Sequence, residues 1–287
     1  MVDRFCIKQI PDMARATFGV ALAKQKTSLF GEEALRQLRE EWFGSLPDPK
    51  QAAVMESGQP FYLHALAQSL RMVGGPDVDI LDTSSEVHSC FATGVHLGHI
   101  HPLGPTPQVF RPKLKESVYD ESVWMPEMDN YFSGPEADAE KILQEQFSEE
   151  EMAGRMKAIS VPEARRQYPD GNLRIAAQGI LEKPDGTYRI VHDGTHGVHL
   201  NNEIKVLDKM DNPGPREMAC IMETSMAAGE RVIFAVNGDI SKAHRRVRVR
   251  QQDWGVQAAR TSKHSNVIWL NKVGAFGVAS AAFWWSR

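Results

Sequence analysis

A single aspartate that follows an apolar run is the residue whose position most suggests chemistry. Asp239 comes shortly after Phe234-Ala235-Val236, a run typical of a buried strand, so it is expected at the rim of the core, where the strand meets water. Mg²⁺ prefers hard oxygen ligands, and the Asp239 carboxylate and the carbonyl of Ile240 offer two of them. An N-cap of a following helix is the other interpretation, and the sequence leaves both open.

A second segment places two cations at the tip of a predicted β-hairpin. Pro184-Asp185-Gly186 is a turn signal between two strand-like runs, residues 179–183 and 187–193. Lys183 and Arg189 flank this turn, so both can reach from the tip toward a polyphosphate. Arginine offers a planar fork to phosphate oxygens and lysine offers a point charge. An exposed hairpin with ordinary surface charges is the alternative.

A third segment, Phe276-Gly277-Val278-Ala279-Ser280-Ala281, joins a loop to the start of a helix. A glycine in that place lets the backbone come close to a base pair. The alternative is a helix start that binds nothing.

In this order, the three segments resemble the fingers-to-palm portion of reverse transcriptases of the retroelement type. The resemblance covers about residues 136–287 and does not cover residues 1–105. It implies that Asp239 is the first metal-binding aspartate of the palm and the catalytic carboxylate, with Mg²⁺ or Mn²⁺ held by Asp239 and the Ile240 carbonyl. It also implies a nucleotide-binding set made of Lys183, Arg189, Ile240, His244, Phe276 and Gly277.

The resemblance has departures. His244 stands where the family often has the aromatic residue that discriminates between sugars, and Ala275 replaces a proline before the Phe276-Gly277 pair. Asp193 and either Asn201 or Asn202 look like the polar residues that follow the family's hairpin. The family's paired aspartates have no counterpart in this chain. Asp239 is then the one metal-binding carboxylate that the resemblance supplies, so it is expected to hold the metal weakly, and the chain alone is expected to be inactive.

Charge is unevenly distributed, although the formal net charge of the chain is −4. An acidic stretch runs from Glu116 to Glu151, and a basic stretch runs from Arg231 to Arg250. A local basic face is what phosphate contact needs, and the whole-chain sum can hide it. Four arginines are the predicted nucleic-acid-binding residues: Arg245, Arg246, Arg248 and Arg250. A solvated strand face is the alternative for them.

Periodicity predicts the elements that must position these residues. Helices are expected within residues 32–43 and 61–72, after a Ser133-x-x-Glu136 capping box, again after Ser148, and over 161–166. A further helix over 215–228 is expected to bury a stripe of Met218, Ile221, Met222 and Met226. Strands are expected over 232–236 and 267–270, with residues 254–258 as the expected hairpin partner of the second strand, and a helix is expected to begin at Ala279.

Together these elements predict an α+β protein, in which a helical N-terminal region precedes a polymerase fingers hairpin and a partial antiparallel palm sheet. Residues 1–105 are expected to form a helical or irregular region of unknown role, and residues 106–287 a partial reverse transcriptase domain. No apolar run approaches the length of a membrane span, and the N-terminus has no signal segment, so an intracellular protein that is not secreted is expected.

The function that the resemblance implies is that of a fragment of an RNA-directed DNA polymerase of a retroelement. Its full-length parent would carry out templated nucleotidyl transfer with an RNA or DNA template–primer, a dNTP and the remaining polyprotein segments. Two alternatives stay open: a non-enzymatic nucleic-acid-binding relic, and an unrelated α+β interaction protein. Zinc binding by Cys90 with His88, His96, His99 and His101 is also left open, because the group has zinc-binding side chains but no recognised spacing.

Overall fold

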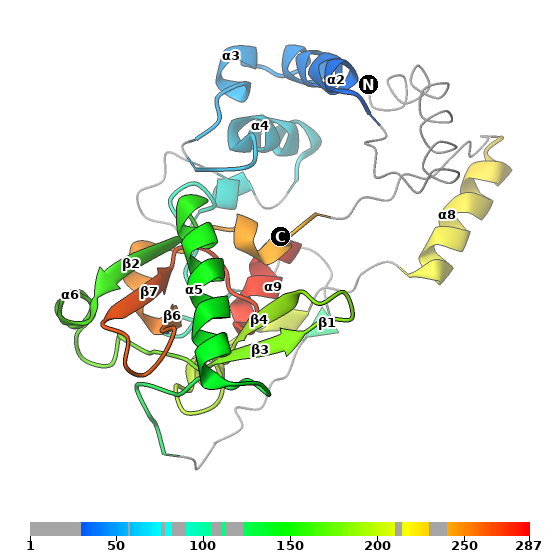
Figure 1. Cartoon of the computed structure of the whole chain (residues 1–287). Coiled ribbons are helices and arrows are strands. Elements are labelled where there is room, and N and C mark those ends of the chain that lie inside the picture. The colour runs from blue at the N-terminus through cyan, green and yellow to red at the C-terminus, as the bar shows by residue number, and fades with distance from the viewer. Residues whose placement is uncertain are drawn as a thin grey trace. The chain divides into compact units, whose positions relative to one another are not determined.

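The computed structural model describes residues 30–56, 58–75, 78–81, 90–104, 111–112, 123–209, 214–229 and 240–287. Asp239, His88 and the predicted strand over 232–236 lie outside these residues. The described elements are helices and small antiparallel sheets, so the predicted α+β class is confirmed (Figure 1). Contacts divide the chain into two compact units, Met1–Ser85 and Glu86–Arg287. That residues 106–287 form a partial polymerase domain stays a prediction.

The first unit is helical in its described part. It contains α2 (Glu32–Gly44), α3 (Pro49–Ala52), α4 (Leu63–Val73) and the 3₁₀ helix η1 (Val78–Leu81). A small core joins these helices, with Leu46, Ala52 and Ala65 buried and Trp42, Phe43 and Tyr62 packed against them. The two helices predicted from apolar periodicity in this region, over 32–43 and 61–72, are therefore confirmed.

The second unit contains the elements that surround the candidate site. Its helices are α5 (Glu136–Met152), α6 (Val161–Gln167), α7 (Leu200–Glu203), α8 (Pro215–Ala227), α9 (Ala279–Ser286) and the 3₁₀ helices η2 (Ala243–Arg246), η3 (Gln251–Asp253) and η4 (Gly255–Gln257). Its strands are β1 (Arg111–Pro112), β2 (Met156–Ser160), β3 (Gln178–Glu182), β4 (Tyr188–His192), β5 (Asp208–Lys209), β6 (Ala258–Ala259) and β7 (Val267–Asn271). Within the described residues, no helix is both long enough and apolar enough to cross a membrane.

The strands of this unit form antiparallel sheets. β3 and β4 make the predicted hairpin, with Gln178 opposite His192 and Glu182 opposite Tyr188. β7 lies between β2 and β6 in a three-stranded sheet. The pairing of β7 with residues near 258 agrees with the sequence, whereas β2 falls in a stretch where the sequence predicted helix.

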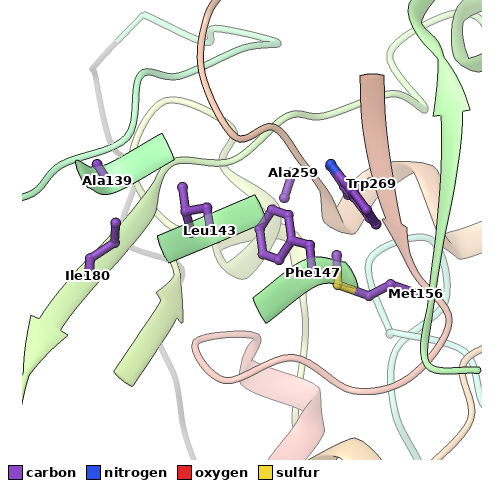
Figure 2. Close-up of a cluster of buried hydrophobic side chains, with 7 residues drawn as sticks. All are labelled: Ala139, Leu143, Phe147, Met156, Ile180, Ala259 and Trp269. Carbon is purple, nitrogen blue, oxygen red and sulfur yellow. The ribbon is translucent and has the colours of Figure 1, made fainter. Parts of the chain in front are cut away.

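Helix α5 packs against both the hairpin and the three-stranded sheet through one apolar cluster. Its Leu143 and Phe147 are buried, and the Phe147 ring lies 5.5 Å from the Trp269 ring of β7. Figure 2 shows the buried cluster, which consists of Ala139, Leu143, Phe147, Met156, Ile180, Ala259 and Trp269. Because the cluster joins α5 to β2, β3, β6 and β7, it holds α5 against both the hairpin and the three-stranded sheet.

Two predictions about this acidic helix are wrong. Pro135, and not the expected Ser133, is the N-cap of α5, and it makes no side-chain cap hydrogen bond. No second helix begins at Ser148, because its hydroxyl donates to the carbonyl of Gln144 (2.7 Å) inside the same helix. The capping motif was present in the sequence, but burial of Phe147 favours one continuous helix.

The predicted helix over 215–228 is confirmed as α8, but its expected buried stripe is wrong. Among the described residues of α8 no side chain is buried, and the side chains of the stripe are between 46% and 67% exposed: Met218, Ile221, Met222 and Met226. An amphipathic period indicates a helix with an apolar face, and does not by itself indicate what covers that face.

Candidate functional site

A cleft of about 760 Å³ in the second unit collects residues from segments that lie far apart in the sequence. Its walls come from the end of α5, the hairpin β3–β4, residues 240–245 and the loop before α9. Four residues of the predicted nucleotide-binding set line it: Lys183, Arg189, Ile240 and Phe276. The structure therefore brings the described parts of the three predicted segments to one site.

The hairpin tip is held in shape by its own turn. Gly186 N–H donates to the carbonyl of Lys183 (2.9 Å), and Lys183 N–H donates to the carbonyl of Thr187 (2.8 Å). Asp185 accepts hydrogen bonds from the backbone N–H (3.0 Å) and hydroxyl (2.6 Å) of Thr187. Gly186 has a φ of 76°, a left-handed conformation that glycine adopts without strain. The turn thus presents Lys183 and Arg189 to the cleft on a fixed frame.

Phe276 forms an aromatic wall that joins two other predicted residues. The guanidinium of Arg189 lies 5.7 Å from the centre of its ring, and the imidazole of His244 lies 4.9 Å from it, centre to centre. The carbonyl of Phe276 accepts a hydrogen bond from the backbone N–H of His192 (2.9 Å), at the end of β4. Phe276 is therefore in contact with both Arg189 and His244.

Asn201 holds the loop at Gly277. Its Nδ2 donates to the carbonyl of Gly277 (2.6 Å), and its Oδ1 accepts from the backbone N–H of Ala279 (2.8 Å). Of the two asparagines left open by the sequence, Asn201 is thus the one that contacts this loop. Asp193 has a local role, because its carboxylate accepts hydrogen bonds from the Thr195 and His196 backbone N–H groups (3.0 and 3.1 Å).

A buried carboxylate is surrounded by three cations at the cleft, and we name Glu150, Arg155, Lys242 and Arg245 the Glu150 cluster; all of its members except Arg155 line the cleft. The carboxylate of Glu150 lies 2.7 Å from Arg155, 2.8 Å from Lys242 and 2.8 Å from Arg245. Burial alone would raise the pKa of Glu150, but hydrogen bonds and charges from Arg155, Arg245 and Lys242 hold it well below its usual range. Glu150 is therefore a permanent anion.

Sequence reasoning missed Glu150 and Lys242 as residues of the site. Glu150 is one of many acidic residues in its stretch, and no local pattern distinguishes it from Glu149 or Glu151. Lys242 follows Asp239 by three residues, in the segment that resembles the palm motif. This position was the signal in the sequence that could have marked Lys242 as a residue of the site.

The four predicted nucleic-acid-binding arginines do not share one free face. Arg245 is only 11% exposed and pairs with Glu150, while Arg250 lies 2.9 Å from Asp253. Arg248 donates to the carbonyl of Ala92 (3.0 Å), and Arg246 donates to that of Ser241 (3.4 Å). Their contact with nucleic acid stays a prediction, and Arg245 would have to leave Glu150 to make one.

The described residues of the cleft do not fit a divalent metal. Glu150 carries the one carboxylate among the described lining residues. Three cations already bond this carboxylate, so it is not available to bind a metal ion. No group of three or more His, Cys, Asp or Glu side chains in the described residues has metal-binding geometry. This finding covers His96, His99 and His101, whereas Asp239 lies outside it. Burial lowers the pKa of both His96 and His99.

His192 is a neutral imidazole in the wall of the cleft. It is 3% exposed, and its Nδ1 lies 3.2 Å from Nε2 of Gln178, which also donates to the carbonyls of Ala176 and Ala177. Burial lowers the pKa of His192 to about 4, with the charge of Arg245 acting in the same direction and that of Asp193 opposing it.

This depressed pKa predicts acid sensitivity. His192 becomes protonated below about pH 6.5 in the unfolded chain but only near pH 4 in the folded chain. Between these two pH values the unfolded state therefore binds more protons, so the free energy of unfolding falls as the pH falls. His192→Gln removes this proton, and its urea-unfolding free energy is expected to fall less than that of the wild type between about pH 7 and pH 4. Equal pH dependence in the two proteins would contradict the assignment.

Comparison with known proteins gives no family for this chain. No protein-family profile and no curated protein matches it. Among solved structures it is similar to the foamy viral protease-reverse transcriptase in complex with dsDNA, with a TM-score of 0.34 and 11% sequence identity. The likeness covers 86% of this chain and 39% of that one. A TM-score this low does not establish a shared fold, so any functional conclusion has to come from the residues of the cleft.

Proposed function

We propose that this chain is a fragment of an RNA-directed DNA polymerase of the retroelement type and that its cleft binds the polyphosphate of a dNTP. One observation carries the proposal. Lys183, Arg189, Ile240 and Phe276 come from three motifs that resemble those of this enzyme class, and they line a single cleft. Chance matches scattered over an unrelated protein would have no reason to meet in one place.

The charge of the cleft supports an anionic ligand. Among the described lining residues there are four basic side chains, Lys183, Arg189, Lys242 and Arg245, and one carboxylate, that of Glu150. A concave surface with excess positive charge concentrates anions, and arginine and lysine are the side chains that bind phosphate oxygens. The Phe276 ring adds an apolar wall against which a base or sugar can pack.

Catalysis belongs, in this proposal, to the full-length parent. Mg²⁺ or Mn²⁺ would be held by Asp239 and the Ile240 carbonyl, and one carboxylate would hold it weakly. This chain has no paired aspartates after Gly277. The proposed partners of the parent are an RNA or DNA template–primer and a dNTP, and its reaction is templated nucleotidyl transfer.

Calorimetric titration with a dNTP tests this function. Lys183→Gln and Arg189→Gln are each expected to weaken binding about tenfold, because each removes one charge-assisted contact to phosphate. Lys157→Gln is the matched control, since Lys157 is an exposed lysine on β2 that does not line the cleft. Its affinity should equal that of the wild type.

The same titration separates the alternatives. A wild-type protein that binds no dNTP, or equal losses in the control and the cleft variants, would overturn the proposal. A nucleic-acid-binding relic would instead show salt-dependent binding to a duplex without binding dNTP. An unrelated interaction protein would bind neither.

A further inference from the structure

We infer that Lys242 is a partner-switching cation: it pairs with Glu150 when the cleft is empty and moves to a phosphate oxygen when a polyphosphate binds. This inference rests on the proposed function, because a polyphosphate is the ligand that it needs. It adds Lys242 to the ligand-binding residues of the cleft and identifies Glu150 as the residue that Lys242 pairs with in the absence of ligand.

The contacts of Glu150 make Lys242 the replaceable member of the cluster. Arg155 bonds both carboxylate oxygens, Oε2 through Nε (2.7 Å) and Oε1 through Nη2 (2.9 Å). Arg245 bonds Oε2 through Nε (3.0 Å) and Nη2 (2.8 Å). Lys242 makes one bond, to Oε1 (2.8 Å), and this oxygen keeps Arg155 when the lysine leaves. Departure of Lys242 therefore leaves no acceptor of Glu150 without a donor.

Lys242 is also the most solvent-exposed of the three cations that bond Glu150. The Lys242 side chain is 50% exposed, whereas Arg155 is 23% and Arg245 is 11% exposed. Arg245 is also anchored to Oδ1 of Asn271 (2.6 Å). Water competes for the half-exposed ammonium of Lys242, and Glu150 keeps both arginines when the lysine leaves, so breaking this one ion pair is expected to cost little. Moving Arg245 would instead break several buried bonds.

The charge and the backbone of the cluster favour the switch. Three cations share one carboxylate, so the cluster repels a further cation and attracts an anion. Lys242 has a φ of 53°, a left-handed conformation that is uncommon for a residue with a side chain. Such backbone conformations concentrate at ligand sites. Lys242 lines the same cleft as Lys183 and Arg189, so one polyphosphate can contact all three.

Titration with inorganic tripolyphosphate tests the switch. Lys242→Gln is expected to lower the affinity about tenfold, the value of one charge-assisted hydrogen bond. Its melting temperature should stay close to that of the wild type, since Glu150 keeps both arginines. Arg189→Gln is the positive control for the cleft, and Lys157→Gln is the control for loss of a lysine outside it.

The carboxyl ¹³C resonance of Glu150 reports the exchange itself. In the wild type, tripolyphosphate should move this resonance toward its position in unliganded Lys242→Gln, because both states lack the lysine contact. In Lys242→Gln the ligand should move it little. A resonance that stays in place on saturation of the wild type, or an unchanged affinity in Lys242→Gln, would overturn the inference.

The outcomes separate the two proposals. If Arg189→Gln weakens tripolyphosphate binding and Lys242→Gln does not, the polyphosphate cleft stands and the partner switch is rejected. If the wild-type protein binds neither tripolyphosphate nor a dNTP, the proposed function is rejected, and the switch with it.

Discussion

Gly277→Ala is expected to destabilise the unit Glu86–Arg287 by about 3 kcal/mol and to displace the aromatic wall of the cleft. Gly277 has a φ of 101°, a conformation that side chains rarely adopt. A Cβ atom there would overlap the carbonyl oxygen of His192, a backbone atom at the end of β4 that cannot swing aside. Urea unfolding gives the free-energy loss, and dNTP titration gives the loss of binding.

Gly154→Ala is the matched control for this change. Gly154 also has a left-handed φ, 71°, but a Cβ atom there would meet nothing within 4 Å. Gly154→Ala should therefore lower the free energy of unfolding by only about 1 kcal/mol, the cost of placing alanine in a left-handed conformation, and should leave ligand affinity unchanged. If both variants lost the same stability, close packing of Gly277 against His192 would not be the cause.

The second large effect is expected for Glu150→Gln, with a loss of about 3 kcal/mol in the free energy of unfolding. The substitution removes the only negative charge of the Glu150 cluster and leaves Arg245 buried without a counter-ion, which is the costly way to break a buried ion pair. Chemical denaturation at neutral pH measures the loss.

Glu149→Gln makes the same chemical change one residue earlier in α5, at an exposed position. A surface substitution of this kind is expected to change stability by less than about 0.5 kcal/mol. Equal effects at residues 149 and 150 would show that the cluster does not hold α5 to the segment 240–245.

Local chemistry explains why the hairpin was predictable. A proline, an aspartate and a glycine at residues 184–186 specify the turn within a few residues, and strands β3 and β4 pair through that turn. Its cations, Lys183 and Arg189, therefore lie on either side of one turn, and the segments that complete the cleft around them come from elsewhere in the fold. Helix α9 was predictable in the same way, from a short apolar sequence that follows a glycine.

Nonlocal contacts explain the failures. β2 is a strand because it pairs with β7, more than a hundred residues later, and no local pattern at Met156–Ser160 records that partner. The apolar face of α8 was read correctly from its period, but burial depends on a second surface. Helix α5 continues through Ser148 because Phe147 packs against Trp269.

The sequence by itself determined the α+β class, the hairpin and the presence of basic side chains beside its turn, because turns, periods and charges are properties of short segments. Tertiary structure alone decided that Glu150 faces three cations, that Asn201 holds Gly277 and that Arg245 is largely buried against Glu150. Each of these depends on side chains separated by many residues along the chain, and only packing brings such groups within bonding distance.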